Sequence, residues 1–387
     1  MLTDQWVVTN FAYGTGPYLR TTELAIAFNS QLEQKTGKRL KILVPWVYGE
    51  KQKKIMLEDF SNYADEIFLD EALGKILASI FYGDSTYEEA LSKWVANVKR
   101  VSTEARSHLS GKIEAMSLSG KSISIDGKNI VLEINRSPRI RYDVALSYLT
   151  TFGYISDILQ GVKKVSSDAI TIDRELLEEG ISVSDWVESN HKIHAVAYPA
   201  TFSWQDSYQK HYVTELLTPP ISNLYPSNTE QIEPGIFVTA TGIPGLEKLY
   251  DNLEKLGLKL YSNDVKSVPG SIKKLPYIIP NENIIFQFAR SGWGSVWLSM
   301  ISGTPLVMPD FDSNDDPEIY FNNLAVESLG IGIVYRGQTL EEIIDKCSEI
   351  RSNSKALCDK ILSRWQTLDG NQYCARIFVD DFIGHRF

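Results

Sequence analysis

The chain has 387 residues, a formal net charge of −10 at pH 7 and an ordinary apolar content of 43%. A single hydrophobic core stops growing efficiently beyond about 250–300 residues, so two domains are expected. The acidic balance argues against a protein that coats nucleic acid, whose phosphates bind clustered Lys and Arg. It leaves room for a local basic pocket that binds a small phosphate ligand.

The cysteines and the N-terminus carry information about the cellular compartment. Cys347, Cys358 and Cys374 form no CxxC pair and no zinc spacing, so reduced thiols and no metal site are predicted. The first residues lack a basic region followed by an apolar run, so no secretion signal is expected. No stretch of about 18 apolar residues is present to span a bilayer. We therefore predict a cytoplasmic protein without a transmembrane segment.

The first half of the chain alternates strands and helices. Strands are predicted at 6–11, 40–45, 65–69 and 194–198, and helices at 71–81, 86–109, 141–161 and from Thr21 or Thr22 to 32. The first strand, the turn at 12–17, the first helix and the second strand form a βαβ unit, which implies a parallel sheet. Residues 122–134 alternate around Asp126-Gly127 and predict a β-hairpin, interpreted as an insertion.

A proline-containing stretch from Thr218 to Pro234 marks the expected domain boundary, because it cannot continue a helix or a central strand. Beyond it, strands are predicted at 236–240, 258–261, 284–288, 305–308 and 332–334, and helices at 245–256, 293–302, 319–329 and 339–366. We therefore predict domains at 1–220 and 235–370, joined by a linker at 221–234. Two such α/β domains would leave a cleft between their strand carboxyl ends, where ligands of open sheets bind.

The most informative segment is Arg290-Ser291-Gly292-Trp293-Gly294-Ser295, which joins a predicted strand directly to a predicted helix. The start of a helix presents unpaired N–H groups and the positive end of the helix dipole. The glycines would let a diphosphate approach the main chain, Ser295 adds a hydroxyl, and Arg290 adds a cation with bidentate geometry. The segment predicts a diphosphate site; the competing interpretation is that the glycines only form a tight strand-to-helix turn.

This segment, followed by Ser302-Gly303-Thr304-Pro305-Leu306-Val307-Met308-Pro309, resembles the donor-binding signature of UDP-glycosyltransferases. It also resembles the matching segment of bacterial peptidoglycan N-acetylglucosaminyltransferases. The resemblance implies the GT-B fold, in which two Rossmann-like doubly wound α/β domains face a cleft and a C-terminal helix, 371–387, crosses back to the first domain. It further implies a hexosyltransferase-type enzyme with a nucleotide-sugar co-substrate, UDP-linked, and no other cofactor. Transfer to an acceptor hydroxyl would be inverting and independent of a metal ion.

The resemblance also implies which residues contact the donor. In chain order they are Thr241, Gly242, Tyr277, Ile278, Arg290, Ser291, Gly292, Trp293, Gly294, Ser295, Asp316, Glu318 and Asn322. Tyr277 has a second interpretation, as an ordinary half-buried aromatic residue. The relatives' ribose-binding Glu is replaced by Leu298, and their sugar-reading Gln pair by Glu318 and Ile319, so the donor sugar stays open.

The sequence carries weaker signals for the acceptor site than for the donor site. Tyr13, Gly14, Thr15 and Gly16 resemble the glycine-rich loop that contacts acceptor and donor in the bacterial family, although such a turn after a strand is common. Inversion needs a base within reach of the acceptor hydroxyl, and Asp70, at the end of a predicted strand, is the candidate by position. His108 is interpreted as a solvated residue on a charged helix. Asp310, Asp312, Asp315 and Asp316 form an acidic cluster that is interpreted as a site for sugar hydroxyls, as a divalent-metal site or as a solvated loop.

Several alternatives stay open. The acceptor could be a small molecule, a glycan or a protein, and self-association into a homo-oligomer is not decided by the sequence. A sugar-nucleotide epimerase or hydrolase could use the same fold. A non-catalytic, glycosyltransferase-like partner protein is the third hypothesis, motivated by Leu298 and by the lack of an evident base.

Overall fold

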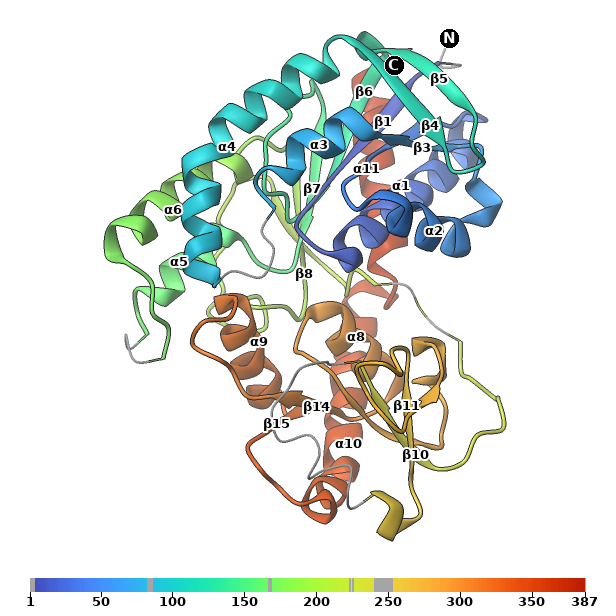
Figure 1. The fold of residues 1–387 in the computed structure, drawn as a ribbon, viewed down its shortest axis with the longest axis vertical. Coiled ribbons are helices and arrows are strands. Elements are labelled where there is room, and N and C mark those ends of the chain that lie inside the picture. The colour runs from blue at the N-terminus through green and yellow to red at the C-terminus, as the bar shows by residue number, and fades with distance from the viewer. Residues whose placement is uncertain are drawn as a thin grey trace. The chain divides into compact units, whose positions relative to one another are not determined.

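The computed structural model describes residues 4–81, 86–165, 169–222, 224, 226–239 and 253–386. They form two compact units, each with its own sheet (Figure 1). Unit 1 contains Met1–Ala197, Gln209–Thr218 and Asn371–Phe387, and unit 2 contains Tyr198–Tyr208 and Pro219–Gly370. Within the described ranges, no helix is long and apolar enough to cross a membrane.

Unit 1 is built on a sheet with the strand order β5-β4-β3-β2-β1-β6-β7-β8-β9. The strands are β1 Trp6–Phe11, β2 Lys41–Pro45, β3 Ile67–Asp70, β4 Lys112–Ser117, β5 Ser122–Asp126, β6 Ile130–Arg136, β7 Ser147–Thr151, β8 Ile193–Ala197 and β9 Glu215–Thr218. Neighbouring strands are parallel except β3 with β4 and β4 with β5. The strand order reverses between β1 and β6, which makes the sheet doubly wound, as predicted.

The helices of unit 1 are α1 Thr15–Thr36, α2 Gly49–Asp59, α3 Glu71–Ala78, α4 Tyr87–Leu109, α5 Ile155–Val162, α6 Arg174–Glu188 and α11 Gly370–Arg386. Of these, α1 begins earlier than the predicted start at Thr21 or Thr22. Gly14 takes a φ of 113° before the first turn of α1, and proline is tolerated in that turn, so Pro17 does not delay the helix. Thr21 and Thr22 do not cap it; their hydroxyls bond to carbonyls four residues back, at 2.7 and 2.8 Å.

The hairpin predicted at 122–134 is wrong. β5 pairs with β4, which precedes it, and β6 pairs in parallel with β1 and β7 at the centre of the sheet. Asp126 accepts a hydrogen bond from the N–H of Lys128 at 3.1 Å and starts a short 3-10 turn that separates β5 from β6. Every residue of β6 is buried, so the segment is part of the core and not an insertion.

The helix predicted at 141–161 is also wrong over its first part. Residues 147–151 form the buried strand β7, and the helix begins only at Ile155. The segment Tyr148-Leu149-Thr150-Thr151 is rich in aromatic and β-branched side chains, which fit a strand that is covered on both faces. Tyr148 is covered by the C-terminal helix α11, where its ring stacks on Phe378 at 4.6 Å and its hydroxyl donates to Asp381 at 2.8 Å.

Unit 2 has a fully parallel sheet with the order β12-β11-β10-β13-β14-β15. Its elements are β10 Gly235–Val238, β11 Lys259–Ser262, β12 Ile272–Lys273, β13 Ile284–Phe288, α8 Trp293–Ser302, β14 Leu306–Pro309, α9 Pro317–Ser328, β15 Gly332–Tyr335 and α10 Leu340–Trp365. The strand order reverses between β10 and β13. Most of the helix predicted at 245–256 lies outside the described residues.

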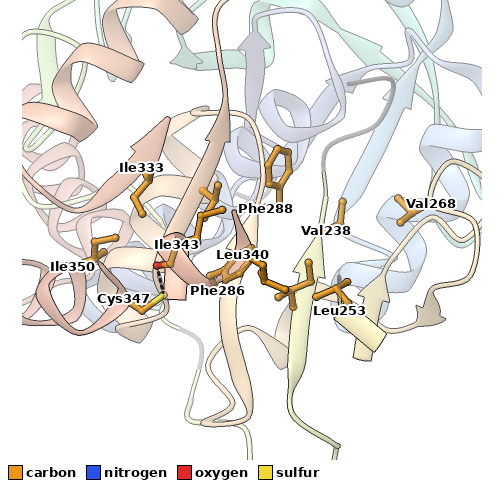
Figure 2. Close-up of a cluster of buried hydrophobic side chains, with 12 residues drawn as sticks. Val238, Leu253, Val268, Phe286, Phe288, Ile333, Leu340, Ile343, Cys347 and Ile350 are labelled. Carbon is orange, nitrogen blue, oxygen red and sulfur yellow. Dashed lines mark hydrogen bonds between the residues drawn. The ribbon is translucent and has the colours of Figure 1, made fainter. Parts of the chain in front are cut away.

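Both faces of the unit 2 sheet are buried. Figure 2 shows one face, where side chains of β10, β13 and β15 pack against the first half of α10: Ile236, Val238, Phe286, Phe288, Ile333, Leu340, Ile343, Cys347 and Ile350. On the other face Phe237, Tyr261 and Ile284 form a second cluster. Because successive residues of β10 belong to different clusters, burial on both faces fixes the register of the strand.

Candidate functional site

The segment predicted to bind a diphosphate lies at the carboxyl end of β13, beside the reversal in strand order between β10 and β13. The N–H of Thr239, just after β10, donates to the carbonyl of Phe288 at 2.9 Å and joins the ends of these two strands. Ligands of open parallel sheets bind at such a reversal. The topology therefore favours the same place as the local sequence.

The two glycines of this segment have no conformational reason to be glycine. Gly292 has a φ of −60° and a ψ of 133°, which any residue can adopt, and Gly294 lies in α8. In the described part of the chain, a Cβ added at either position would meet no atom within 4 Å. A tight turn therefore does not account for them, and no side chain or main chain of the described residues fills the space above them.

The first turn of α8 also presents unpaired donors. The N–H groups of Ser295 and Val296 bond to the carbonyl of Gly292, at 2.9 and 3.2 Å. Those of Trp293 and Gly294 have no acceptor among the described residues. Two N–H groups that no described residue satisfies, at the positive end of a helix dipole, favour an anion.

Arg290 supplies the cation at this position. Its side chain is about half exposed and forms an ion pair with Asp315, from the loop that follows β14. An exposed pair of this kind contributes little to stability, because both ions keep much of their hydration. The guanidinium can therefore exchange its carboxylate partner for a phosphate at low cost.

Trp293 and Asn322 were predicted to contact the donor, yet both side chains are buried within unit 2. The amide NH2 of Asn322 donates to the carbonyl of Ser291 at 3.0 Å and to the carboxylate of Glu318 at 2.9 Å. Its amide oxygen accepts from the Trp293 indole at 2.8 Å and from the Thr201 hydroxyl at 2.9 Å. An amide side chain has two N–H donors and two lone pairs, so Asn322 is saturated and supports the segment from behind.

The acidic residues after β14 have separate roles. Asp316 caps α9 by accepting from the N–H of Glu318 at 3.0 Å, and Asp310 lies 3.5 Å from Arg336. Glu318 is half-buried, and its carboxylate accepts a hydrogen bond from Asn322, which in turn bonds to Ser291 of the strand-to-helix segment. Among the described residues, no group of three or more His, Cys, Asp or Glu side chains could hold a metal ion.

The remaining donor residues predicted in unit 2 fall in different environments. Tyr277 is 44% exposed and its hydroxyl donates to Glu230 at 3.2 Å. Ile278 belongs to the apolar cluster with Phe237, and Leu298 packs against the same cluster. Leu298 is therefore a partly buried apolar residue at the position where the resemblance implies a ribose-binding carboxylate. Thr241 and Gly242 lie outside the described residues.

In unit 1, the predicted acceptor loop is the entry to α1. The N–H of Gly14 donates to the Tyr48 hydroxyl at 2.7 Å, while Thr15 and Gly16 belong to the first helical turn. The centroid of the Tyr13 ring lies 6.0 Å from that of Tyr48 and 5.8 Å from that of Phe81. The carboxyl ends of β1 and β2 thus carry an aromatic cluster of which Tyr13 is the exposed member.

Asp70, the candidate base, is fully buried. One carboxylate oxygen caps α3 by accepting from the N–H of Leu73 at 2.9 Å, and the other lies 2.7 Å from His108 Nε2. His108 is therefore not a solvated residue: its side chain is only 17% exposed because it packs over this buried carboxylate. The two residues are 38 positions apart, and nothing local in the sequence indicates the contact.

Three of the histidines gather near β8 and β9 of unit 1. His211 lies 2.8 Å from Asp157 and 3.5 Å from Asp185, and the hydrogen bond to Asp157 raises its pKa to about 9. Burial lowers the pKa of His194 to about 4, and burial also lowers the pKa of His191. The ring of His194 stacks on the ring of Tyr212, with their centroids 4.2 Å apart.

No protein-family model matches the sequence, and no curated protein matches it significantly. Many solved structures share its fold along nearly the whole chain. A UDP-glucosyltransferase from Polygonum tinctorium that glucosylates indoxyl is 11% identical, with a TM-score of 0.60 over 98% of each chain. UGT71G1 from Medicago truncatula, complexed with UDP-glucose, is 11% identical with a TM-score of 0.55 over 98% of each chain.

A bacterial structure agrees with these two. The glycosyltransferase SsfS6 of Streptomyces sp. SF2575 is 11% identical, with a TM-score of 0.55 over 96% of this chain and 99% of that one. At such identities the likeness establishes architecture, and the two parallel-stranded α/β units match it. The chain has the GT-B fold, as the resemblance implied.

Proposed function

We propose that this protein transfers a hexose from a UDP-linked donor to an acceptor hydroxyl, with inversion and without a metal ion. One observation carries the proposal: the junction of β13 and α8 combines three features. They are two main-chain N–H groups without an acceptor among the described residues, two glycines that the backbone conformation does not require, and Arg290. The fold supports it, because structures with the same architecture are complexes with UDP or UDP-glucose.

The chemistry depends on where charge develops. As the bond from the sugar to the diphosphate breaks, negative charge builds on the leaving group, and preorganised N–H donors with Arg290 would stabilise it. The acceptor hydroxyl must lose a proton to a base. Asp70 is buried, so we assign the base to the His108–Asp70 pair, in which the imidazole takes the proton and the carboxylate orients the ring.

The test uses two arginines with matched surroundings. Arg290 and Arg336 are equally exposed at 49%, and each is paired with acidic residues of unit 2. Titration calorimetry with UDP should show loss of binding in Arg290→Ala and retained binding in Arg336→Ala, with both variants folded by circular dichroism. An Arg290→Ala protein that binds UDP as the wild type does would overturn the proposal.

A second candidate function is favoured by Leu298. Because this side chain packs against the apolar core, the usual ribose contact is missing, and a protein that binds a nucleotide sugar without transferring it is consistent with that change. Incubation with UDP-sugars and an acceptor panel, with measurement of released UDP, separates the two functions. Binding without release would identify the non-catalytic protein, and release with no acceptor present would identify hydrolysis.

A further inference from the structure

The segment Tyr198–Tyr208 belongs to unit 2, although the residues on both sides of it in the sequence belong to unit 1. It meets α8 at two tryptophans one turn apart. The indole of Trp293 donates to the Thr201 hydroxyl at 3.0 Å, and the indole of Trp297 donates to the carbonyl of Pro199 at 2.8 Å. The Phe202 ring packs on Phe321 of α9 at 5.1 Å.

Thr201 is the polar centre of these contacts. Its hydroxyl donates to the amide oxygen of Asn322 at 2.9 Å, and the single indole N–H of Trp293 is shared between that amide oxygen and the Thr201 hydroxyl, so three buried side chains from distant parts of the chain close a ring of hydrogen bonds. Thr201 is 1% exposed, Trp293 1% and Asn322 0%. In such surroundings each bond is held strongly, because water cannot replace a lost partner.

The ring fixes two successive parts of the proposed anion site. Trp293 is the first residue of α8, so locking its indole limits rotation of the peptide groups whose N–H donors have no acceptor among the described residues. Asn322, in the same ring, holds the carbonyl of Ser291, the residue before the N-cap. The donors at 293 and 294 are thereby oriented from both sides by side chains that never reach the ligand.

We propose that Thr201 is a positioning residue for the donor site: its hydroxyl, 92 residues before Trp293, sets the direction of the first-turn N–H groups of α8. The inference rests on the proposed function for its ligand, and on the hydrogen-bond ring alone for its geometry. A purely structural role for the same bonds would lower stability without a selective effect on the first turn. The two roles are separable by experiment.

Thr201→Val removes the hydroxyl and keeps the branched shape, and Thr201→Ser restores the hydroxyl. The matched control is Ser299→Ala, on the same helix, which removes a buried bond of 2.7 Å to Gln287 away from the first turn. We expect Thr201→Val to weaken UDP binding about five- to tenfold by calorimetry, with Thr201→Ser within about twofold of wild type. Ser299→Ala should lower the thermal midpoint to a similar extent and leave UDP affinity unchanged.

Hydrogen exchange of the peptide 291–297 in the absence of nucleotide gives a readout independent of the ligand. Faster exchange there in Thr201→Val, but not in Ser299→Ala, supports the positioning role. Unchanged exchange and unchanged UDP affinity in Thr201→Val would overturn it, and so would equal losses of affinity in both variants. If Thr201→Val exchanges faster but the wild type binds no UDP, the geometry stands and the proposed function is what fails, so Thr201 has no donor site to position.

Discussion

Replacement of Gly294 by alanine should move stability and nucleotide affinity in opposite directions. Gly294 is the second residue of α8, its φ is not positive, and a Cβ there would meet nothing within 4 Å among the described residues. Alanine is a better helix former than glycine and restricts the unfolded chain, so Gly294→Ala should stabilise unit 2 by about 0.5–1 kcal/mol. In a unit of this size, that corresponds to a rise in thermal midpoint of about 1–4 °C.

The same methyl group should interfere with the ligand. If a diphosphate lies against the N–H groups of Trp293 and Gly294, a Cβ occupies part of the space it needs, and we expect UDP affinity to fall at least about tenfold, or about 1.4 kcal/mol. Gly384→Ala is the matched control, since Gly384 is also a helical glycine with nothing within 4 Å of its Cβ. It should raise stability in the same way and leave UDP binding unchanged.

Scanning calorimetry measures the first effect and titration with UDP measures the second. A Gly294→Ala protein that gains stability and binds UDP like the wild type would refute the argument that a ligand uses this space. A protein that loses stability would contradict the backbone geometry itself. Only the combination of higher stability and weaker binding agrees with both.

Two further predictions concern charge. Asp315→Asn should release Arg290 from its ion pair and strengthen UDP binding up to about fivefold, because an exposed pair contributes at most about 1 kcal/mol; unchanged or weaker binding would show that Arg290 does not act on the ligand. The folded-state pKa of His211 is about 9, against 6.5 in the unfolded chain. Its contribution to stability is therefore fully present below about pH 6.5 and is lost as pH rises through about 9. This pKa shift corresponds to about 3 kcal/mol in the free energy of unfolding, which we reduce to about 2 kcal/mol because the ring is partly exposed. Because Asp185 also contacts His211, the difference in free energy of unfolding by urea between wild type and Asp157→Asn should be larger at pH 6 than at pH 10 by up to about 2 kcal/mol, whereas a difference that does not change with pH would refute the linkage.

The sequence was sufficient for the fold where local periodicity and long-range packing agree. The strands at 6–11 and 284–288 and the helix at 293–302 were predicted because short apolar runs end in glycine-containing loops, and the structure confirms them. β6 was misassigned because Glu133 and Asn135 alternate with apolar residues as in the arm of a hairpin, although both are buried in a strand that lies between two parallel neighbours. Only the choice of partner separates the two, and that choice depends on residues far away in the chain.

In the candidate site, too, the features that depend on local sequence could be predicted and those that depend on distant contacts could not. The first-turn N–H groups of α8 and Arg290 follow from a strand that runs directly into a helix, which a sequence displays locally. Thr201 could not be predicted, because it meets Trp293 and Asn322 only after chain segments 92 and 121 residues apart are brought together. The His108–Asp70 contact was missed for the same reason.

Asn322 supports the candidate site from behind, and its position determines how its replacement should behave. The resemblance implied a contact with the donor, but all four hydrogen-bonding positions of its amide are used inside unit 2. If recognition depends on the main chain of α8 and on Arg290, replacing Trp293 or Asn322 must lower stability and affinity together, because both residues act by holding the helix start in place. Gly294→Ala instead separates the two quantities, since it changes the surface presented to the ligand and leaves the supporting bonds intact. A substitution that weakens UDP binding and raises stability therefore marks a residue that faces the nucleotide. A substitution that weakens binding and lowers stability marks a residue that holds the helix start in place.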